Sequence, residues 1–312
     1  MNAQRDSASV PVSSWCSARL FVTDEFAAPP VILRVDDSVI GTLGNFSAST
    51  GKAKSKKTFN VCAIVAAAMT GGTVLNYSAS LPPERRRILY VDTEQSRFHC
   101  KRVLCRILRL AGLPTDVHPP LLEFLCLRGY ATKERLRKIE EAIYDLDDLG
   151  LVVIDGIRDL AHDINSPGEA TDLITKLMQW TDERRIHIHT VLHLNKGDDN
   201  TRGHLGTELN NKAETVLQIT KDDFDRDISS VAAMHIRDRA VRLSHQRRCL
   251  TRAGRGLPTS ADYRCQKFRL CRGLRGQAPR GVGIVVLQSR PCFLFVAYRT
   301  VAEQLCRHRP FV

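Results

Sequence analysis

The segment GKAKSKKT, at positions 51–58, has the residue types of a phosphate-binding loop. It matches the pattern G-x-x-x-x-G-K-[ST] at Gly51, Lys57 and Thr58, with Lys56 at the position of the second glycine. A loop that leads into a helix directs unpaired backbone N–H groups at one spot, where the peptide dipoles favour an anion. Lys57 would reach the outer phosphates of a nucleotide, and the Thr58 hydroxyl would bind Mg²⁺. The alternative is a basic, solvated turn.

The remaining positions of the segment suit a tight and positively charged loop. Ala53 and Ser55 are small, while Lys52, Lys54 and Lys56 add charge. We expect residues 51–58 together to surround the nucleotide. Lys56 is the one departure from the pattern, and its effect on the loop geometry and on the affinity for nucleotide is left open.

Four further side chains could supply the chemistry of nucleotide hydrolysis. Asp155 ends the apolar run LVVID, which suits a carboxylate that helps to hold Mg²⁺, although an Asp can also cap a turn. Glu94 follows the run ILYVD and could position the attacking water, unless it is only a surface acid. His193, together with Asn195, could sense the γ-phosphate, or could simply be hydrogen-bonded in place.

The apolar pattern predicts the elements that would position these residues. Strands are expected at 46–50, 87–92, 121–127, 149–155, 186–194, 216–220 and 230–236, and helices at 59–69, 97–111, 133–146 and 170–184. This alternation predicts an α/β fold, a mainly parallel twisted sheet with helices on both faces. Ligands of such sheets bind at the carboxyl ends of the strands, where Gly51, Glu94, Asp155 and His193 would meet.

Taken together, these segments resemble the RecA-like P-loop ATPase superfamily. The similarity is to the branch with RepA-type and DnaB-type hexameric helicases and related AAA family ATPases of bacterial mobile elements. The similar segments are TGKAKSKKTF (50–59), ILYVDTEQS (88–96), LVVIDGIRDL (151–160), VLHLNKG (191–197) and RGHLGTELNNKAETVL (202–217). They cover roughly two thirds of the chain, between about residues 30 and 240.

The resemblance implies an ATPase that uses Mg²⁺. It makes Glu94 the catalytic glutamate and Asp155 the acid that ends the Walker B strand. In the helicases of this branch the segment after the sensor strand approaches nucleic acid. That segment corresponds to 196–206 here, with Lys196, Arg202 and Gly203 as the expected contacts with single-stranded DNA.

The resemblance further implies a ring of identical subunits. The last core strand of such ATPases ends in a basic pair that reaches the nucleotide of a neighbouring subunit. Arg237 and Arg239 are the candidates here, because a spacing of two lets both side chains project from one side of a strand.

The net charge of the 312-residue chain, +12 at pH 7, is concentrated at its C-terminal end. Positions 239–312 hold sixteen Arg or Lys and two acids, which leaves thirty basic and thirty-two acidic residues before them. We therefore expect a loosely ordered segment (1–28), an ATPase domain (29–238) and an Arg- and Cys-rich tail (239–312). The tail is either a basic arm that binds nucleic acid or, as we favour, an out-of-frame extension. Within the tail, only residues 282–287 and 293–298 have the pattern of strands.

The cysteines and the hydropathy of the sequence indicate the cellular compartment in which the protein is expected. Ten cysteines without a C-x-x-C pair indicate a reducing environment and make a metal cluster unexpected. The longest apolar run, at about 61–69, is too short to cross a bilayer, and a charged-then-apolar leader is missing from the first residues. We therefore expect a cytoplasmic protein without a membrane partner.

Two classes of function are compatible with these patterns. The first is an ATPase that couples hydrolysis to work on DNA, as a helicase-like motor in the replication or mobilisation of a plasmid or mobile element. The second is a nucleotide-gated regulatory or DNA-binding module of the same fold, with little or no turnover. The set of Lys57, Thr58, Glu94 and Asp155 favours the motor, whereas Lys56 favours the module.

Overall fold

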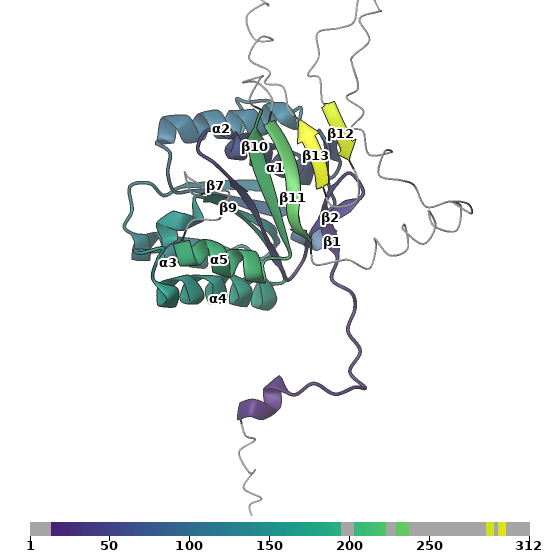
Figure 1. Ribbon diagram of the computed structural model, residues 1–312, viewed down its shortest axis with the longest axis vertical. Helices are drawn as coiled ribbons and strands as arrows, with labels where there is room; N and C mark the ends of the chain where they lie inside the picture. Colours follow the sequence, from purple (N-terminus) through teal and green to yellow (C-terminus); the bar gives the residue numbers. More distant parts are fainter. Residues whose placement is uncertain (1–13, 195–202, 223–228, 237–284, 290–292, 298–312) are drawn as a thin grey trace, which may run out of the picture.

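The computed structural model describes residues 14–194, 203–222, 229–236, 285–289 and 293–297, which form an α/β fold (Figure 1). A nine-stranded sheet has the order β12-β13-β11-β10-β3-β9-β8-β6-β7. Its strands are β3 (Phe46–Gly51), β6 (Arg87–Asp92), β7 (Leu122–Cys126), β8 (Leu149–Asp155), β9 (His187–His193), β10 (Thr215–Lys221), β11 (Ser229–Ile236), β12 (Val285–Ser289) and β13 (Phe293–Ala297). Strands β10 to β7 are mutually parallel, while β11, β13 and β12 pair antiparallel. The predicted fold class is confirmed.

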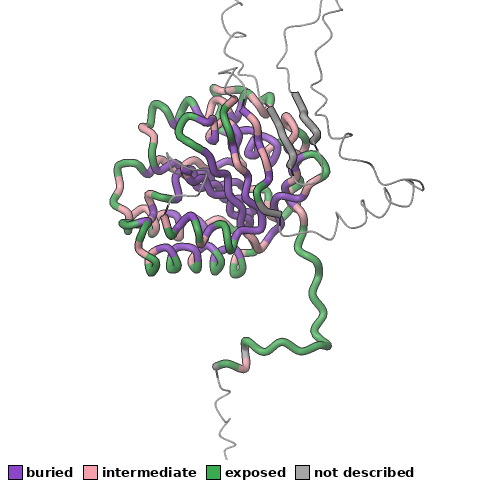
Figure 2. Tube along the Cα trace, in the orientation of Figure 1, coloured by how far each residue is buried: buried purple, intermediate pink, exposed green. Residues whose placement is uncertain are grey.

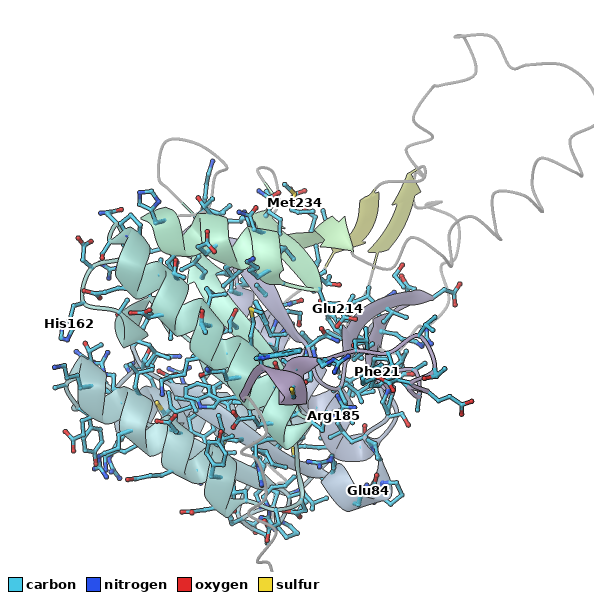
Figure 3. All side chains as sticks on the ribbon, turned by 90° about the horizontal axis from the view of Figure 1, so that it is seen from below. Phe21, Glu84, His162, Arg185, Glu214 and Met234 are labelled. Carbon is cyan, nitrogen blue, oxygen red and sulfur yellow. The ribbon has the colours of Figure 1, made fainter. Side chains whose placement is uncertain are left out.

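Helices cover both faces of this sheet. They are α1 (Lys57–Thr70), α2 (Arg97–Leu110), α3 (Thr132–Asp145), α4 (Pro167–Arg184) and α5 (Gly203–Lys212), with short 3-10 helices η1 (Ser14–Ala18), η2 (Pro83–Arg85) and η3 (Ile157–Leu160). Helices α1 and α2 pack together on one face, and α3, α4 and α5 lie on the other (Figure 1). Figure 3, seen from below, looks onto this second layer, in which Arg185 follows the last turn of α4.

The apolar character of the central strands follows from their position between two helical layers. Every residue of β3 and of β8 is buried. Figure 2 shows this buried centre between helices whose outer turns are exposed. One cluster of buried side chains, which includes Ile64 and Ile107, lies on the α1 and α2 side. A second, with Ile143, Trp180 and Leu209, lies on the other side. Strands covered on both faces read as continuous apolar runs.

A second, smaller sheet lies beside the large one and was not predicted. Its strands are β1 (Val31–Val35), β2 (Ser38–Thr42), β4 (Thr73–Val74) and β5 (Tyr77–Ala79), in the antiparallel order β2-β1-β5-β4. These strands have two to five residues each, too few for a clear alternation of apolar and polar residues.

A chain of buried polar side chains joins β3, β9 and α1 inside the core. The Ser47 hydroxyl oxygen lies 2.7 Å from Nε2 of His187 and 2.8 Å from Nδ1 of His189. Nε2 of His189 lies 2.8 Å from the Ser49 hydroxyl oxygen, which also accepts a hydrogen bond from Asn60 at 3.3 Å. Burial lowers the pKa of His187 to about 4 and the pKa of His189 to about 3. Both rings are therefore neutral at pH 7.

Most predicted elements of the core are found at their expected places. Strands β6 and β8 have the predicted bounds, and α2 ends one residue before the predicted end. Helix α4 begins three residues earlier than predicted, because Ser166 caps it by accepting a hydrogen bond from the Glu169 N–H. Helix α5 was not predicted. Of the C-terminal tail the structure describes only β12 and β13, so the proposed nature of residues 239–312 stays a prediction.

Candidate nucleotide-binding site

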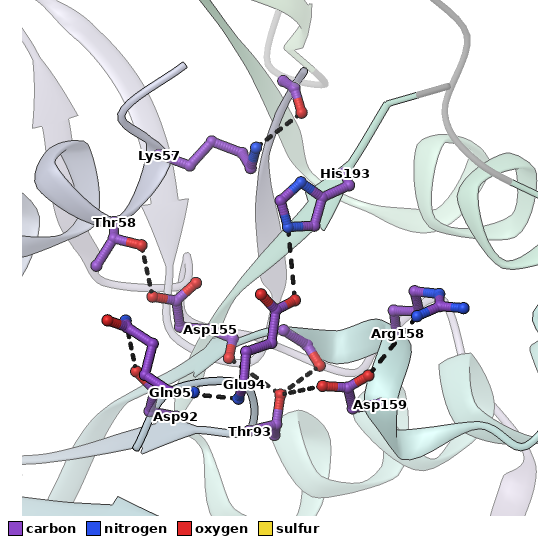
Figure 4. A network of polar contacts seen from close by, with 12 residues as sticks. Lys57, Thr58, Asp92, Thr93, Glu94, Gln95, Asp155, Arg158, Asp159 and His193 are labelled. Atoms are coloured by element: carbon purple, nitrogen blue, oxygen red, sulfur yellow. Dashed lines mark hydrogen bonds and ion pairs between the residues drawn. The ribbon is translucent and has the colours of Figure 1, made fainter. Parts of the chain in front are cut away.

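The candidate site lies at the carboxyl edge of the parallel strands (Figure 4). In the register of the sheet Gly51 is paired with His193, and Asp155 is paired with both Val191 and Asp92. The loop at 51–58, the end of β8 and the turn after β6 therefore meet at one edge. This is the position expected for a ligand of a parallel sheet.

The loop between β3 and α1 is tight, and two lysines adopt unusual backbone conformations in it. The N–H of Ser55 donates to the carbonyl of Lys52 at 3.2 Å. Lys54 and Lys56 have φ values of 65° and 69°, in the left-handed region that favours glycine. At Gly51 a Cβ atom would lie 2.4 Å from the carbonyl oxygen of Ile219, so only glycine fits there. Lys56 thus adopts the backbone conformation for which glycine is best suited.

Lys57 is buried at the first position of α1. Its ammonium group donates hydrogen bonds of 2.8 Å to the Gly51 carbonyl and 2.9 Å to the Lys52 carbonyl. Desolvation lowers the pKa of Lys57 to about 8, although the negative charges of Asp155 and Glu94 oppose the shift. The group is still mainly protonated at pH 7 and lies within the loop, as a phosphate-binding lysine requires.

Thr58 and Asp155 form the contact between the loop helix and the apolar strand β8. The Thr58 hydroxyl donates to Oδ2 of Asp155 at 3.0 Å, and the Tyr90 hydroxyl donates to the same oxygen at 2.9 Å. Burial raises the pKa of Asp155 to about 6, and the nearby charge of Asp92 adds to this effect. A cation beside this carboxylate would offset the repulsion and stabilise its ionised form.

Asp92 organises the turn that holds Glu94. Its Oδ1 accepts hydrogen bonds from the backbone N–H groups of Glu94 at 3.0 Å and Gln95 at 2.8 Å. Its Oδ2 accepts one from the Gln95 side-chain amide at 2.8 Å. These three bonds fix the backbone from which the Glu94 side chain projects (Figure 4).

The Glu94 carboxylate points toward His193 on β9. Nε2 of His193 lies 3.5 Å from Oε1 of Glu94 (Figure 4). The hydrogen bond from His193 lowers the pKa of Glu94, and the positive charges of Lys57 and Arg158 lower it further, against the effect of burial. Glu94 is therefore ionised at neutral pH and is partly exposed at the edge of the site, where it could orient a water molecule.

The turn after β8 is tied to the Glu94 turn. The Thr93 hydroxyl lies 2.9 Å from the Gly156 carbonyl and 3.1 Å from Oδ2 of Asp159. Gly156 has a φ of 105°, and a Cβ there would lie 2.2 Å from the Thr93 hydroxyl. The two carboxylate-bearing turns therefore form one unit.

The residues present fit a nucleotide with Mg²⁺. The Ser55 hydroxyl is buried without a hydrogen-bond partner among the described residues, and the Lys56 side chain does not cap α1. The buried Ser55 hydroxyl can donate to a phosphate, and the helix dipole of α1 favours an anion at this end. Hydroxyl and carboxylate oxygens, as in Thr58 and Asp155, suit Mg²⁺, which takes few protein ligands besides water and phosphates. Within the described ranges, no cluster of three or more His, Cys, Asp or Glu side chains could hold a metal by itself.

The structure brings together most of the predicted site residues. Residues 51–58, Glu94, Asp155 and His193 meet at the edge described above. Gly203 lies elsewhere, at the start of α5, with a φ of 71° and the Ile164 carbonyl beside it. The other predicted residues, Asn195, Lys196, Arg202, Arg237 and Arg239, lie outside the described residues.

Sequence reasoning missed three residues that shape the site, namely Tyr90, Asp92 and Thr93. A signal for Asp92 was present, because it ends an apolar strand just as Asp155 does. The sequence gives no comparable signal for Tyr90 and Thr93, because their roles depend on contacts with β8 and with the turn after it.

In the part of the chain that the structure describes, no helix is long and apolar enough to span a membrane.

Comparisons with known proteins identify a similar solved structure and a matching family model. Among solved structures, the chain is similar to one described as the RadB recombinase, with 14% sequence identity and a TM-score of 0.44. That match covers 63% of this chain and 83% of the other. Comparison with curated proteins finds no match. A family model described as an AAA domain matches residues 19–199, more than half of the sequence. The chain therefore belongs to this AAA domain family.

Proposed function

We propose that the chain binds ATP and Mg²⁺ at residues 51–58 and hydrolyses the nucleotide. The observation that carries this proposal is the meeting of Lys57, Thr58, Asp155 and Glu94, from three separate segments, at one edge of the sheet. When bound, Mg²⁺ supplies a Lewis acid that neutralises charge on the phosphate oxygens.

The loop residues bind and orient the phosphates. Lys57 exchanges its hydrogen bonds with the carbonyls of Gly51 and Lys52 for bonds with the outer phosphates. The backbone N–H groups of the loop and of the first turn of α1 surround the anion. Thr58 and Asp155 would hold the metal.

Glu94 orients the attacking water, and His193 senses the γ-phosphate. The ionised Glu94 carboxylate can accept a hydrogen bond from a water molecule at the edge of the site. His193, at 3.5 Å from Glu94, links that carboxylate to the end of β9.

On the basis of the family resemblance, we also propose that the chain acts on single-stranded DNA and assembles into a ring of identical subunits. Lys196, Arg202 and Gly203 would approach DNA, while Arg237 and Arg239 would reach a neighbouring subunit's nucleotide. Mixing an Arg237→Ala/Arg239→Ala protein with a Glu94→Gln protein should then restore part of the turnover, because each supplies what the other lacks. Turnover per chain that is independent of concentration, without recovery on mixing, contradicts the ring.

A second candidate is a nucleotide-gated regulatory or DNA-binding module with little turnover. The left-handed conformation of Lys56 favours it, because a side chain at this position constrains the loop that surrounds the phosphates. ATP turnover of the full chain with and without single-stranded DNA separates the two candidates. Stimulation by DNA supports the motor for plasmid or mobile-element DNA, and ATP binding without turnover supports the module.

A further inference from the structure

Helix α2 is the most strongly charged helix of the described chain. Among fourteen residues it has no acidic side chain and five basic ones, which are Arg97, Lys101, Arg102, Arg106 and Arg109. Helix α3 has four basic and four acidic residues, and α4 has two basic and four acidic residues. The positive charge of α2 therefore lies on the face that it covers together with α1, while the opposite face is covered by α4, which is acidic, and by α3 and α5, which are neutral (Figure 1).

Among the described residues, no acidic side chain forms an ion pair with the basic side chains of α2. Lys101, Arg102 and Arg109 are exposed, and the described residues offer them no ion pair. On α3, by contrast, Arg137 and Lys138 are each paired with a glutamate one helical turn away. The charge of α2 is thus available to an anionic partner.

An exposed aromatic ring lies within this basic surface. The Phe98 side chain is 69% exposed. Phe98 and Arg102 are neighbours on the surface of the helix, because residues four apart lie on the same face. The opposite face of α2, with Val103 and Ile107, is buried against the core. This packing leaves α2 without an apolar face that could enter a lipid bilayer.

The basic surface continues into a hollow at the N-terminal end of α2. A cavity of about 580 Å³ is lined there by Gln95, Ser96, Arg97, Cys126, Arg128, Gly129 and Tyr130. Among the described residues, two arginines and a tyrosine line it and no acidic residue does. The described residues also give Arg97 and Arg128 no ion pair.

We propose that the outer surface of α2 and the hollow beside Arg128 bind a single-stranded nucleic acid. Clustered basic side chains neutralise backbone phosphates, and an exposed ring offers a stacking platform for a base. Lys101, Arg102 and Arg109 contact phosphates, and Phe98 stacks on a base. This surface contains none of the residues at 196–206. It shares its class of partner with the proposed function but does not depend on ATP hydrolysis.

The test is the binding of a fluorescent oligothymidine to the full chain without ATP, measured by anisotropy over a range of salt concentrations. The variant Lys101→Gln/Arg102→Gln/Arg109→Gln removes three phosphate contacts. Its affinity should fall on the order of tenfold or more, and the slope of log affinity against log salt should fall by about two. A variant that binds as the parent does overturns the proposal.

The matched control is Lys133→Gln/Arg137→Gln/Arg185→Gln, which removes the same charge from exposed positions on the opposite face. It should bind the oligonucleotide as the parent does. Equal weakening of both variants would mean that only net charge matters, and would overturn the proposal. The basic tail is present in both proteins and cancels from the comparison. ATP binding, measured on the same samples, should be unchanged, so a failure of the proposed nucleotide site is seen separately.

A second variant, Phe98→Ala, keeps every charge and tests the stacking. It should weaken binding of the single strand by about tenfold and leave binding of a duplex nearly unchanged, because bases in a duplex are already stacked. Equal effects on both nucleic acids contradict the assignment to single strands. If the triple α2 variant instead loses binding to phosphatidylserine vesicles while it keeps the oligonucleotide, the surface belongs to a lipid headgroup and the proposal is wrong.

Discussion

The Thr58 hydroxyl donates a hydrogen bond of 3.0 Å to Oδ2 of Asp155 and so connects the first turn of α1 to the end of β8. These two residues are 97 positions apart in the chain. Their contact places a neutral oxygen ligand and a carboxylate at one point, which is the arrangement that Mg²⁺ binding beside a phosphate requires.

We expect the loss of either group to weaken Mg²⁺ binding. Asp155→Asn and Thr58→Ala should each raise the Mg²⁺ concentration for half-maximal ATP turnover by roughly tenfold or more. Thr58→Ser keeps the hydroxyl and serves as the control. A magnesium titration of turnover measures the effect, and an unchanged midpoint in Asp155→Asn would remove this residue from the metal site.

Lys57 and Lys56 should differ sharply although they are adjacent. Lys57→Ala removes the buried ammonium inside the loop and should abolish measurable ATP binding. Lys56→Gly should keep it, and should stabilise the fold by about 1 kcal/mol because glycine adopts the left-handed conformation without strain. Lys54→Gly is the matched control, at a φ of 65° in the same loop. Calorimetry measures the ATP affinity of each variant, and thermal unfolding measures its stability. Loss of ATP binding in Lys56→Gly alone would contradict the assignment of Lys57 as the phosphate-binding lysine.

Glu94→Gln should separate ATP binding from hydrolysis. The amide keeps the size of the side chain but cannot accept a proton from water, so turnover should fall by roughly 10²-fold or more. ATP affinity should stay within a few-fold of the parent. Glu84→Gln, at an exposed position away from the site, is the control. A mild effect, equal to that of the control, would favour the regulatory module over the enzyme.

Acid should destabilise the fold through the two buried histidines. The pKa values of His187 and His189 are about 4 and 3 in the folded chain, below the ordinary value of 6.5. The unfolded chain therefore binds more protons, and stability falls as the pH drops below 6.5, by up to about 2 kcal/mol per histidine at pH 5. Asp155, with a raised pKa of about 6, partly opposes this loss, because its folded form binds a proton more readily.

The variant His189→Gln isolates one of these contributions. It should be less stable than the parent at pH 7.5, since it disrupts the bonds to Ser47 and Ser49. It should nevertheless lose less stability than the parent between pH 7.5 and pH 5. Urea unfolding at both pH values tests this, and equal losses in the two proteins would mean that His189 is not the titrating group.

The sequence predicted the elements that carry the site because their signals are local. Strands β6 and β8 are apolar runs that end in Asp92 and Asp155, so both their type and their ends could be read directly. The pattern of the phosphate loop predicted a helix after it, although α1 begins at Lys57, two residues before the predicted start. Because parallel strands end at the same edge of a sheet, the alternation of strands and helices also predicted that Glu94 and His193 would meet.

Other features depend on contacts that no local pattern encodes. The role of Asp92 arises from the backbone N–H groups of Glu94 and Gln95, which any residue provides. The left-handed conformation of Lys56 contradicts the usual preference of its residue type and could only be suspected from the motif. The small antiparallel sheet was missed because its strands are short and because its central pairing, β1 with β5, joins distant parts of the chain.

The most direct test of the proposed function is the release of phosphate from ATP by the purified full chain. Release is measured with Mg²⁺ and after removal of Mg²⁺ by a chelator, and the Lys57→Ala variant is measured in parallel. We expect phosphate release by the parent that depends on Mg²⁺ and is lost in Lys57→Ala, because the ammonium of Lys57 lies inside the loop at 51–58. The absence of release by the parent, or equal release by parent and Lys57→Ala, contradicts hydrolysis at this site.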